Sequence, residues 1–148
     1  MQRSQRKRRI LYHTDGRHTH LYQLEPPLTF EQLCLPVDEL LGTMVDTLVL
    51  SMGGGTTFFH RTKVGTLWGE LEEERGGAVW EHLVWYRPSE VVRQLLREGY
   101  DQTQVLVDRA HQKGLEFIAS IWTNAPAGNK LGDGRLDRFR RDHPEYQI

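Results

Sequence analysis

Residues 101–124, DQTQVLVDRAHQKGLEFIASIWTN, predict a helix, a short turn and a buried strand that ends in polar residues. Asp101 is suited to cap the helix, and Gln104 stands where it can complete a capping box. Gly114 follows a lysine, at the place where a left-handed residue ends a helix. The run 115–121 is almost wholly apolar, as in strands covered on both faces. This helix-then-strand step is typical of parallel α/β proteins, which place their chemistry where strands end.

The rest of the chain predicts further elements of the same two kinds. Residues 52–88 show no sustained helix or strand periodicity, although a short hairpin is expected around Gly76-Gly77, and connections of this length tend to be functional lids or insertions. The expected elements are strands at 10–15 and 45–50, a helix at 29–41 capped by Thr29 and interrupted near Pro36, a helix at 89–98 capped by Ser89 and ended by Gly99, and a short helix at 136–141.

Three strands of this kind, each followed by helical sequence, predict an α/β fold with parallel strands. They form either a small open sheet or the opening part of a larger one. A complete eight-fold barrel takes about 250 residues, whereas this chain has 148. We therefore expect about three βα units from the N-terminal part of a TIM-like (β/α)8 barrel, and we expect the barrel to be incomplete.

Several segments carry a resemblance to a known family: Asp15-Gly16-Arg17-His18, the strand at 45–49, Lys63-Val64-Gly65, the helix and strand at 104–120 with the step AHQKGLE, and 139–145. Together they are similar to the N-terminal portion of uncharacterised bacterial glycoside-hydrolase-like (β/α)8-barrel proteins, over most of residues 9–148. The resemblance implies a partial barrel at 10–148 that binds or acts on carbohydrate. In such barrels the acid/base and nucleophile carboxylates usually come from strand four onward, so it also implies that this chain alone is inactive.

Candidate sugar-binding residues are Asp15, Trp122 and Asn124, which stand at the ends of the first and third expected strands. An indole offers an apolar plane to a pyranose ring, and an amide both donates to and accepts from hydroxyls. The resemblance adds that strand three ends in a polar group facing the sugar, matched by Asn124. The structural alternatives are a turn at Asp15-Gly16, a tryptophan closing the barrel top and an asparagine in a turn. The catalytic residues are left unassigned, because hydrolysis needs two carboxyl groups and Asp15 is the only acid placed at a strand end.

Other motifs give weaker evidence for a functional site. His18-Thr19-His20 has a metal-ligand spacing but follows a glycine in a loop, so we expect surface histidines and no metal site. Gly53-Gly54-Gly55 lacks the Lys-Ser/Thr and the helix start of a phosphate-binding loop. Cys34, the single cysteine, is expected to pack in the first helix. No cofactor is expected.

Charge and composition bound the partners. Residues 1–9 carry five cations and no acid, against a net charge of −1 for the chain. We interpret them as a basic disordered arm in solvent, in preference to a nucleic-acid contact.

No apolar run could span a membrane and no secretory segment is visible, so a cytoplasmic protein is expected. Besides a carbohydrate ligand, the partners expected are a second copy or the missing C-terminal half of the barrel. The alternatives are a non-catalytic α/β module that self-associates through its open sheet edge, and nucleic-acid association through the arm.

Overall fold

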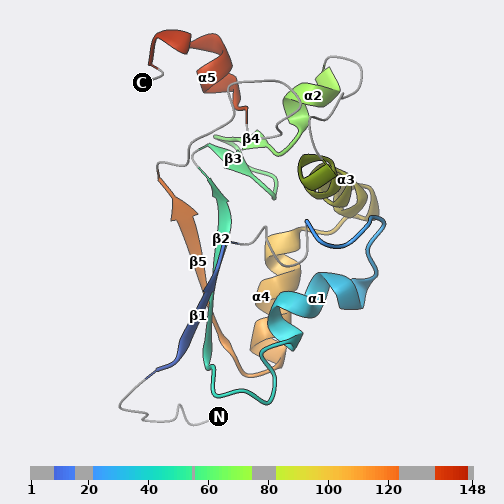
Figure 1. Ribbon diagram of the computed structural model, residues 1–148, viewed down its shortest axis with the longest axis vertical. Coiled ribbons are helices and arrows are strands. Elements are labelled where there is room, and N and C mark those ends of the chain that lie inside the picture. Colours follow the sequence, from blue (N-terminus) through green and yellow to red (C-terminus); the bar gives the residue numbers. More distant parts are fainter. Residues whose placement is uncertain (1–8, 16–21, 55, 75–82, 124–135, 147–148) are drawn as a thin grey trace.

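The computed structural model describes residues 9–15, 22–54, 56–74, 83–123 and 136–146, and its fold is mixed α/β, as expected (Figure 1). Its elements in chain order are β1 (Leu11–Thr14), α1 (Phe30–Asp38), β2 (Thr47–Gly54), β3 (Thr57–Phe58), β4 (Thr66–Leu67), α2 (Glu70–Glu74), α3 (Leu83–Glu98), α4 (Gln102–Gln112), β5 (Glu116–Trp122), α5 (Arg138–Asp142) and a 3₁₀ turn (Pro144–Tyr146).

The sheet is open and mostly parallel. β2 lies at its centre and pairs in parallel with β1 and with β5, so that Thr47 stands opposite both Leu11 and Glu116. The short β3 pairs antiparallel with the end of β2, and β4 pairs in parallel with β3. The three strands expected from the sequence are therefore present, parallel and adjacent in chain order. All three direct their carboxyl ends toward the same end of the molecule (Figure 1).

Helices cover one face of these three strands. α1 and α4 lie side by side on that face (Figure 1), and their apolar side chains form one core cluster with the sheet. A second cluster packs α3 against the segment after β2, with Trp68 and Phe59 stacked at 4.9 Å. The side chain of Gln94 joins α3 to the chain before α1, because its oxygen accepts from the Leu28 amide at 2.8 Å and its nitrogen donates to the Leu28 carbonyl at 2.7 Å. Two cores thus hold α1, α3 and α4 to one side of the sheet.

The opposite face carries no helix in the described part of the chain. We call it the helix-free face and define it by Leu11, His13, Val49 and Ile118, which alternate with the residues that face the helices. At its amino end Thr47 Oγ1 donates to Glu116 Oε2 at 3.0 Å, and Arg9 pairs with the same oxygen at 2.8 Å. Residues 1–8 of the expected arm lie outside the described residues.

The expectation that the third strand is buried on both faces is wrong. Ile118 on the helix-free face and Ile121 on the other are both exposed, Ile121 by 54%. The physical reason is the position of β5, which is bonded only to β2 among the described strands, so that neither its outer edge nor its carboxyl half is covered. Apolar composition predicted the strand correctly but not its surroundings.

Helix ends follow the sequence closely in most places. Asp101 caps α4 by accepting from the Gln104 amide at 3.1 Å, and Gly114 and Gly99 have the left-handed φ values of 79° and 78° that end helices. The Gln104 side chain donates to Asp108 instead of completing the box. The reciprocal capping box forms at Thr29, where the helix was also expected to begin.

Two boundary predictions need correction. Ser89 is not a cap but is fully buried inside α3, which begins six residues earlier at Leu83 and passes through Pro88. Pro36 likewise lies within α1 and does not interrupt it. Both prolines are buried, so core packing outweighs the lost backbone bond.

The long connection expected at 52–88 is shorter than predicted, because β2 extends to Gly54 and because β3, β4, α2 and the start of α3 fill much of it. The hairpin expected at 76–77 lies outside the described residues.

None of the helices in the described ranges is both long and apolar enough to cross a membrane.

Candidate functional site

A hollow of about 270 Å³ lies near the carboxyl ends of the parallel strands. One side comes from Thr56 in the turn after β2 and from Thr123, directly after β5. The other side comes from the segment that contains α5, which lies at the same end of the molecule as these strand ends (Figure 1). The lining residues are Thr56, Thr123, Asp137, Phe139, Arg140, His143 and Tyr146. Parallel α/β folds place their ligands at this end of the sheet.

Hydrogen bonds and ion pairs fasten α5 to the rest of the molecule. The Arg138 amide donates to Thr66 Oγ1 of β4 at 3.0 Å, and its guanidinium pairs with Glu70 at 2.7 Å and with Glu74. Burial alone would raise the pKa of Glu70. The hydrogen bonds from Arg138 and from the Leu67 amide outweigh it, so the pKa lies below its ordinary value. Glu70 is therefore held as the carboxylate that anchors this wall.

Asp137 gives the hollow a buried carboxyl group. Its side chain is almost fully buried, and its Oδ1 accepts from the Arg140 amide at 2.8 Å, which caps α5. Its Oδ2 lies 3.6 Å from Arg140 Nε. The wall of the hollow therefore presents a fixed carboxylate next to a guanidinium, together with the hydroxyls of Thr56 and Thr123.

Three rings form the apolar side of the hollow. Phe139 and Tyr146 stack with centroids 5.9 Å apart and planes 15° apart, and His143 lies 4.9 Å from Phe139. The first two are 54% and 68% exposed. His143 Nδ1 lies 3.1 Å from Glu145 Oε1. Exposed rings beside hydroxyls, a carboxylate and a guanidinium suit a ligand that has both apolar faces and hydroxyl groups.

The residues that the sequence predicts to bind sugar differ in their position relative to the hollow. Trp122 is the last residue of β5, is partly exposed, and precedes Thr123 of the hollow. Asp15 follows β1 on the other side of β2, so about 10 Å of sheet separates the two strands. Asp15 is not among the lining residues. Asn124 lies outside the described residues.

The positions of the described side chains also bear on metal binding and on hydrolysis. In the described ranges no three His, Cys, Asp or Glu side chains gather as a metal site would require. His18 and His20 lie outside those ranges. Asp137 is the one carboxylic acid that lines the hollow in the described part of the chain, so the pair needed for glycoside hydrolysis is not assembled there.

Sequence reasoning missed most of the hollow. The sequence predicts a short helix at 136–141 and assigns no site role to Phe139, His143 or Tyr146. Two signals were available: Phe139 and His143 are four residues apart, which places them on one side of a helical turn, and the stretch 139–145 belongs to the family resemblance.

No family model matches the chain, and no curated protein matches it.

Proposed function

We propose that this chain is the carbohydrate-binding front part of a glycoside-hydrolase-like (β/α)8 barrel, with its sugar site in the hollow beside α5. The observation that carries the proposal is the position of that hollow. It lies near the carboxyl ends of parallel strands and joins exposed rings to hydroxyl, carboxylate and guanidinium groups.

The sheet supports the barrel part of the proposal. In a barrel, consecutive strands are neighbours, helices cover the outside and branched side chains fill the inside in layers. β1, β2 and β5 are neighbours in chain order, with α1 and α4 on one face. On the helix-free face Val49 and Ile118 stand opposite each other in register. In the proposed barrel this face lines the interior.

The sugar contacts follow from the chemistry of the hollow. Tyr146 and Phe139 stack on a pyranose ring, while Thr123 and Arg140 bond to its hydroxyl groups. Trp122 extends the apolar surface along β5, as the sequence predicts, and Asp15 contacts a sugar unit further along the sheet. Asn124 is proposed as a hydroxyl ligand from the sequence alone.

Catalysis is assigned to barrel strands beyond this chain. The hollow offers one acid, Asp137, whose two oxygens are already engaged with Arg140. We therefore propose binding without hydrolysis for this chain. From the sequence alone we also propose that the protein is cytoplasmic.

Calorimetric titration of the full chain with β-1,4- and α-1,4-linked hexasaccharides tests the proposal. Tyr146→Ala is expected to weaken binding of the recognised glycan by about two- to ten-fold, the loss of one aromatic contact. Tyr100→Ala removes another exposed tyrosine, outside the hollow, and is the matched control. Equal loss in both variants, or no binding by the unmodified chain, would refute the site.

Self-association is a second candidate, favoured by the helix-free face. Leu11 and Ile118 are exposed on it, and within the described strands β1 and β5 pair only with β2. Light scattering after size exclusion decides the matter. A discrete dimer that Ile118→Ser converts to monomer would establish it, whereas a monomer at all concentrations would exclude it.

A further inference from the structure

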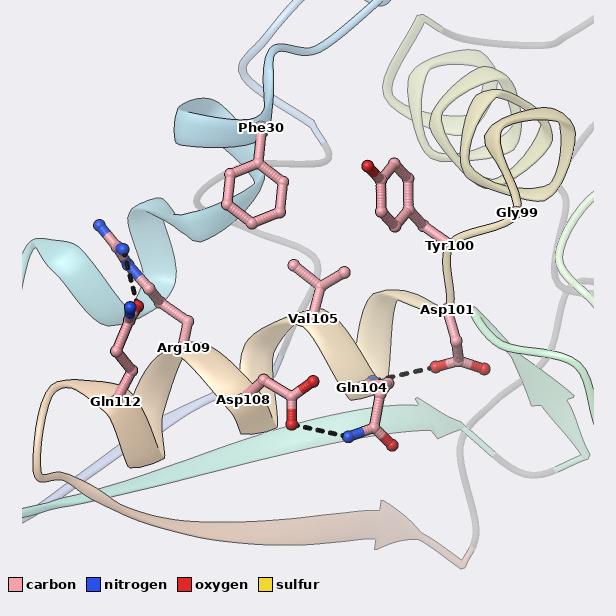
Figure 2. A pocket seen from close by; sticks show the side chains of 9 residues that line it. All are labelled: Phe30, Gly99, Tyr100, Asp101, Gln104, Val105, Asp108, Arg109 and Gln112. Atoms are coloured by element: carbon pink, nitrogen blue, oxygen red, sulfur yellow. Dashed lines mark hydrogen bonds between the residues drawn. The ribbon is translucent and has the colours of Figure 1, made fainter.

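A larger hollow, of about 600 Å³, runs along α4 on the side that faces α1. Figure 2 shows Phe30, the first residue of α1, and Tyr100, from the link between α3 and α4, standing on either side of Val105. The two ring centroids are 6.3 Å apart with planes 49° apart, and the side chains are 49% and 47% exposed. The groove therefore has an apolar floor and two aromatic walls that are open to a ligand.

The charges along this groove are unbalanced. Its cation, Arg109, is already paired, because its Nε and Nη2 each lie 2.8 Å from an oxygen of Asp38. Among the described residues, the carboxylates of Asp101 and Asp108 accept hydrogen bonds from Gln104 alone, and neither carboxylate forms an ion pair there. Two carboxylates that have no cationic partner among the described residues thus line the same groove as two exposed rings (Figure 2).

Rings and carboxylates together favour a cation. An ammonium or guanidinium group gains from the face of an aromatic ring and from a nearby carboxylate at the same time. The lining residues on α4 run from its cap, Asp101, to Gln112, a length of about 16 Å. An extended chain of about five residues covers that distance. The groove is thus longer than a single small cation needs.

We propose that this groove binds an extended segment of a partner protein that carries arginine or lysine at alternate positions. Alternation directs these side chains to one side of the extended segment, toward Tyr100, Phe30 and Asp108. The proposal is independent of the sugar site, because the two hollows share no lining residue.

A neighbouring cation allows a test in which one substitution should strengthen binding and another should weaken it. Arg61 lines an adjoining hollow of about 330 Å³ that shares Gly99, Tyr100 and Asp101 with the groove. It has no ion pair with another described residue, so it opposes a cationic ligand at the Asp101 end. Removing its charge should therefore strengthen binding, while removing that of Asp108 should weaken it.

The experiment is fluorescence anisotropy of the full chain with a fluorescein-labelled hexapeptide of alternating alanine and arginine. The same peptide with glutamine in place of arginine is the reference, and it is expected to bind at least about ten-fold more weakly. Asp108→Asn should weaken binding of the arginine peptide by about three- to five-fold, and Tyr100→Ala by about two- to five-fold. Arg61→Gln should strengthen it, and Asp142→Asn, which removes a carboxylate from α5, should leave it unchanged. Circular dichroism establishes that each variant is folded.

Three outcomes would overturn the proposal. Equal binding of the two peptides would remove the role of the cation. Equal loss in Asp108→Asn and Asp142→Asn would reduce the effect to overall charge. If the peptide binds only to a variant lacking residues 1–8, the basic segment of the chain itself occupies the groove, and the partner peptide is the wrong occupant.

Discussion

Arg138 and Glu70, which are 68 residues apart in the sequence, form an ion pair with an N–O distance of 2.7 Å. Through it the wall of the small hollow is held against α2 and β4. Glu70 also accepts from the Leu67 amide at 2.8 Å, so one carboxylate links three segments of the chain. The candidate site is thus built by a long-range contact, not by any local motif.

This pair predicts how the site responds to a substitution that lies outside it. Glu70→Ala should lower the free energy of unfolding by about 1 kcal/mol, because Arg138 is partly exposed and water replaces part of the interaction. It should also weaken glycan binding, since α5 loses its anchor. Urea unfolding and a glycan titration on the same protein measure both. Glu25→Ala, which removes a more exposed carboxylate from its pair with Arg87, is the control and should leave glycan binding unchanged.

The ion pair between Asp38 and Arg109 predicts that the free energy of unfolding depends on pH. The hydrogen bond from Arg109 holds the pKa of Asp38 below its ordinary value of 3.8. Folding therefore favours the carboxylate, and this stabilisation is fully present above pH 3.8 and is lost as the pH falls through the lower, folded-state pKa. Asp38→Asn should destabilise the protein at pH 6 and have a smaller effect at pH 2.5. A loss of stability that is the same at both pH values would contradict the assignment.

The two faces of the sheet predict unequal costs for the same substitution. Leu106 is buried between α4 and the sheet, so Leu106→Ala should lower the free energy of unfolding by about 2–5 kcal/mol. Leu11 is exposed on the helix-free face, and Leu11→Ala should cost less than about 1 kcal/mol. Chemical unfolding of both variants at the same protein concentration makes the comparison. Comparable losses would mean that another surface covers the helix-free face in solution.

Cys34 predicts a chemical readout of the core. Its side chain is fully buried in α1, and burial raises the pKa of the thiol. Both effects oppose formation of an accessible thiolate, so reaction with Ellman's reagent should be slow in the native protein and fast in urea. Rapid stoichiometric labelling of the native protein would show that α1 opens readily or does not pack as described.

The parts of the fold set by local chemistry were the parts predictable from sequence. Asp101 and Gly114 mark the ends of α4 because capping and left-handed φ depend on the residues themselves. The exposure of Ile121 depends on what lies beyond the edge of the sheet, which strand composition does not encode. Ser89 has the residue type of a cap, yet packing of α3 places it inside the helix.

The candidate site divides in the same way. The position of Trp122 at the end of β5 was predictable, because strand ends can be read from the run of apolar residues, but Trp122 does not line the hollow. Tyr146 and Asp137 were not, since their place beside Thr123 depends on contacts between Arg138 and residues far away in the chain. A short helix read alone gives no indication of the strand end that it faces.

The most direct test of the sugar site is a nitrogen–proton correlation spectrum of the labelled full chain during titration with the best-binding hexasaccharide. Our account predicts chemical-shift changes that cluster at Thr56, Thr123, Phe139, His143 and Tyr146. Changes centred instead on Phe30 and Tyr100, or no changes at saturating glycan, would contradict it.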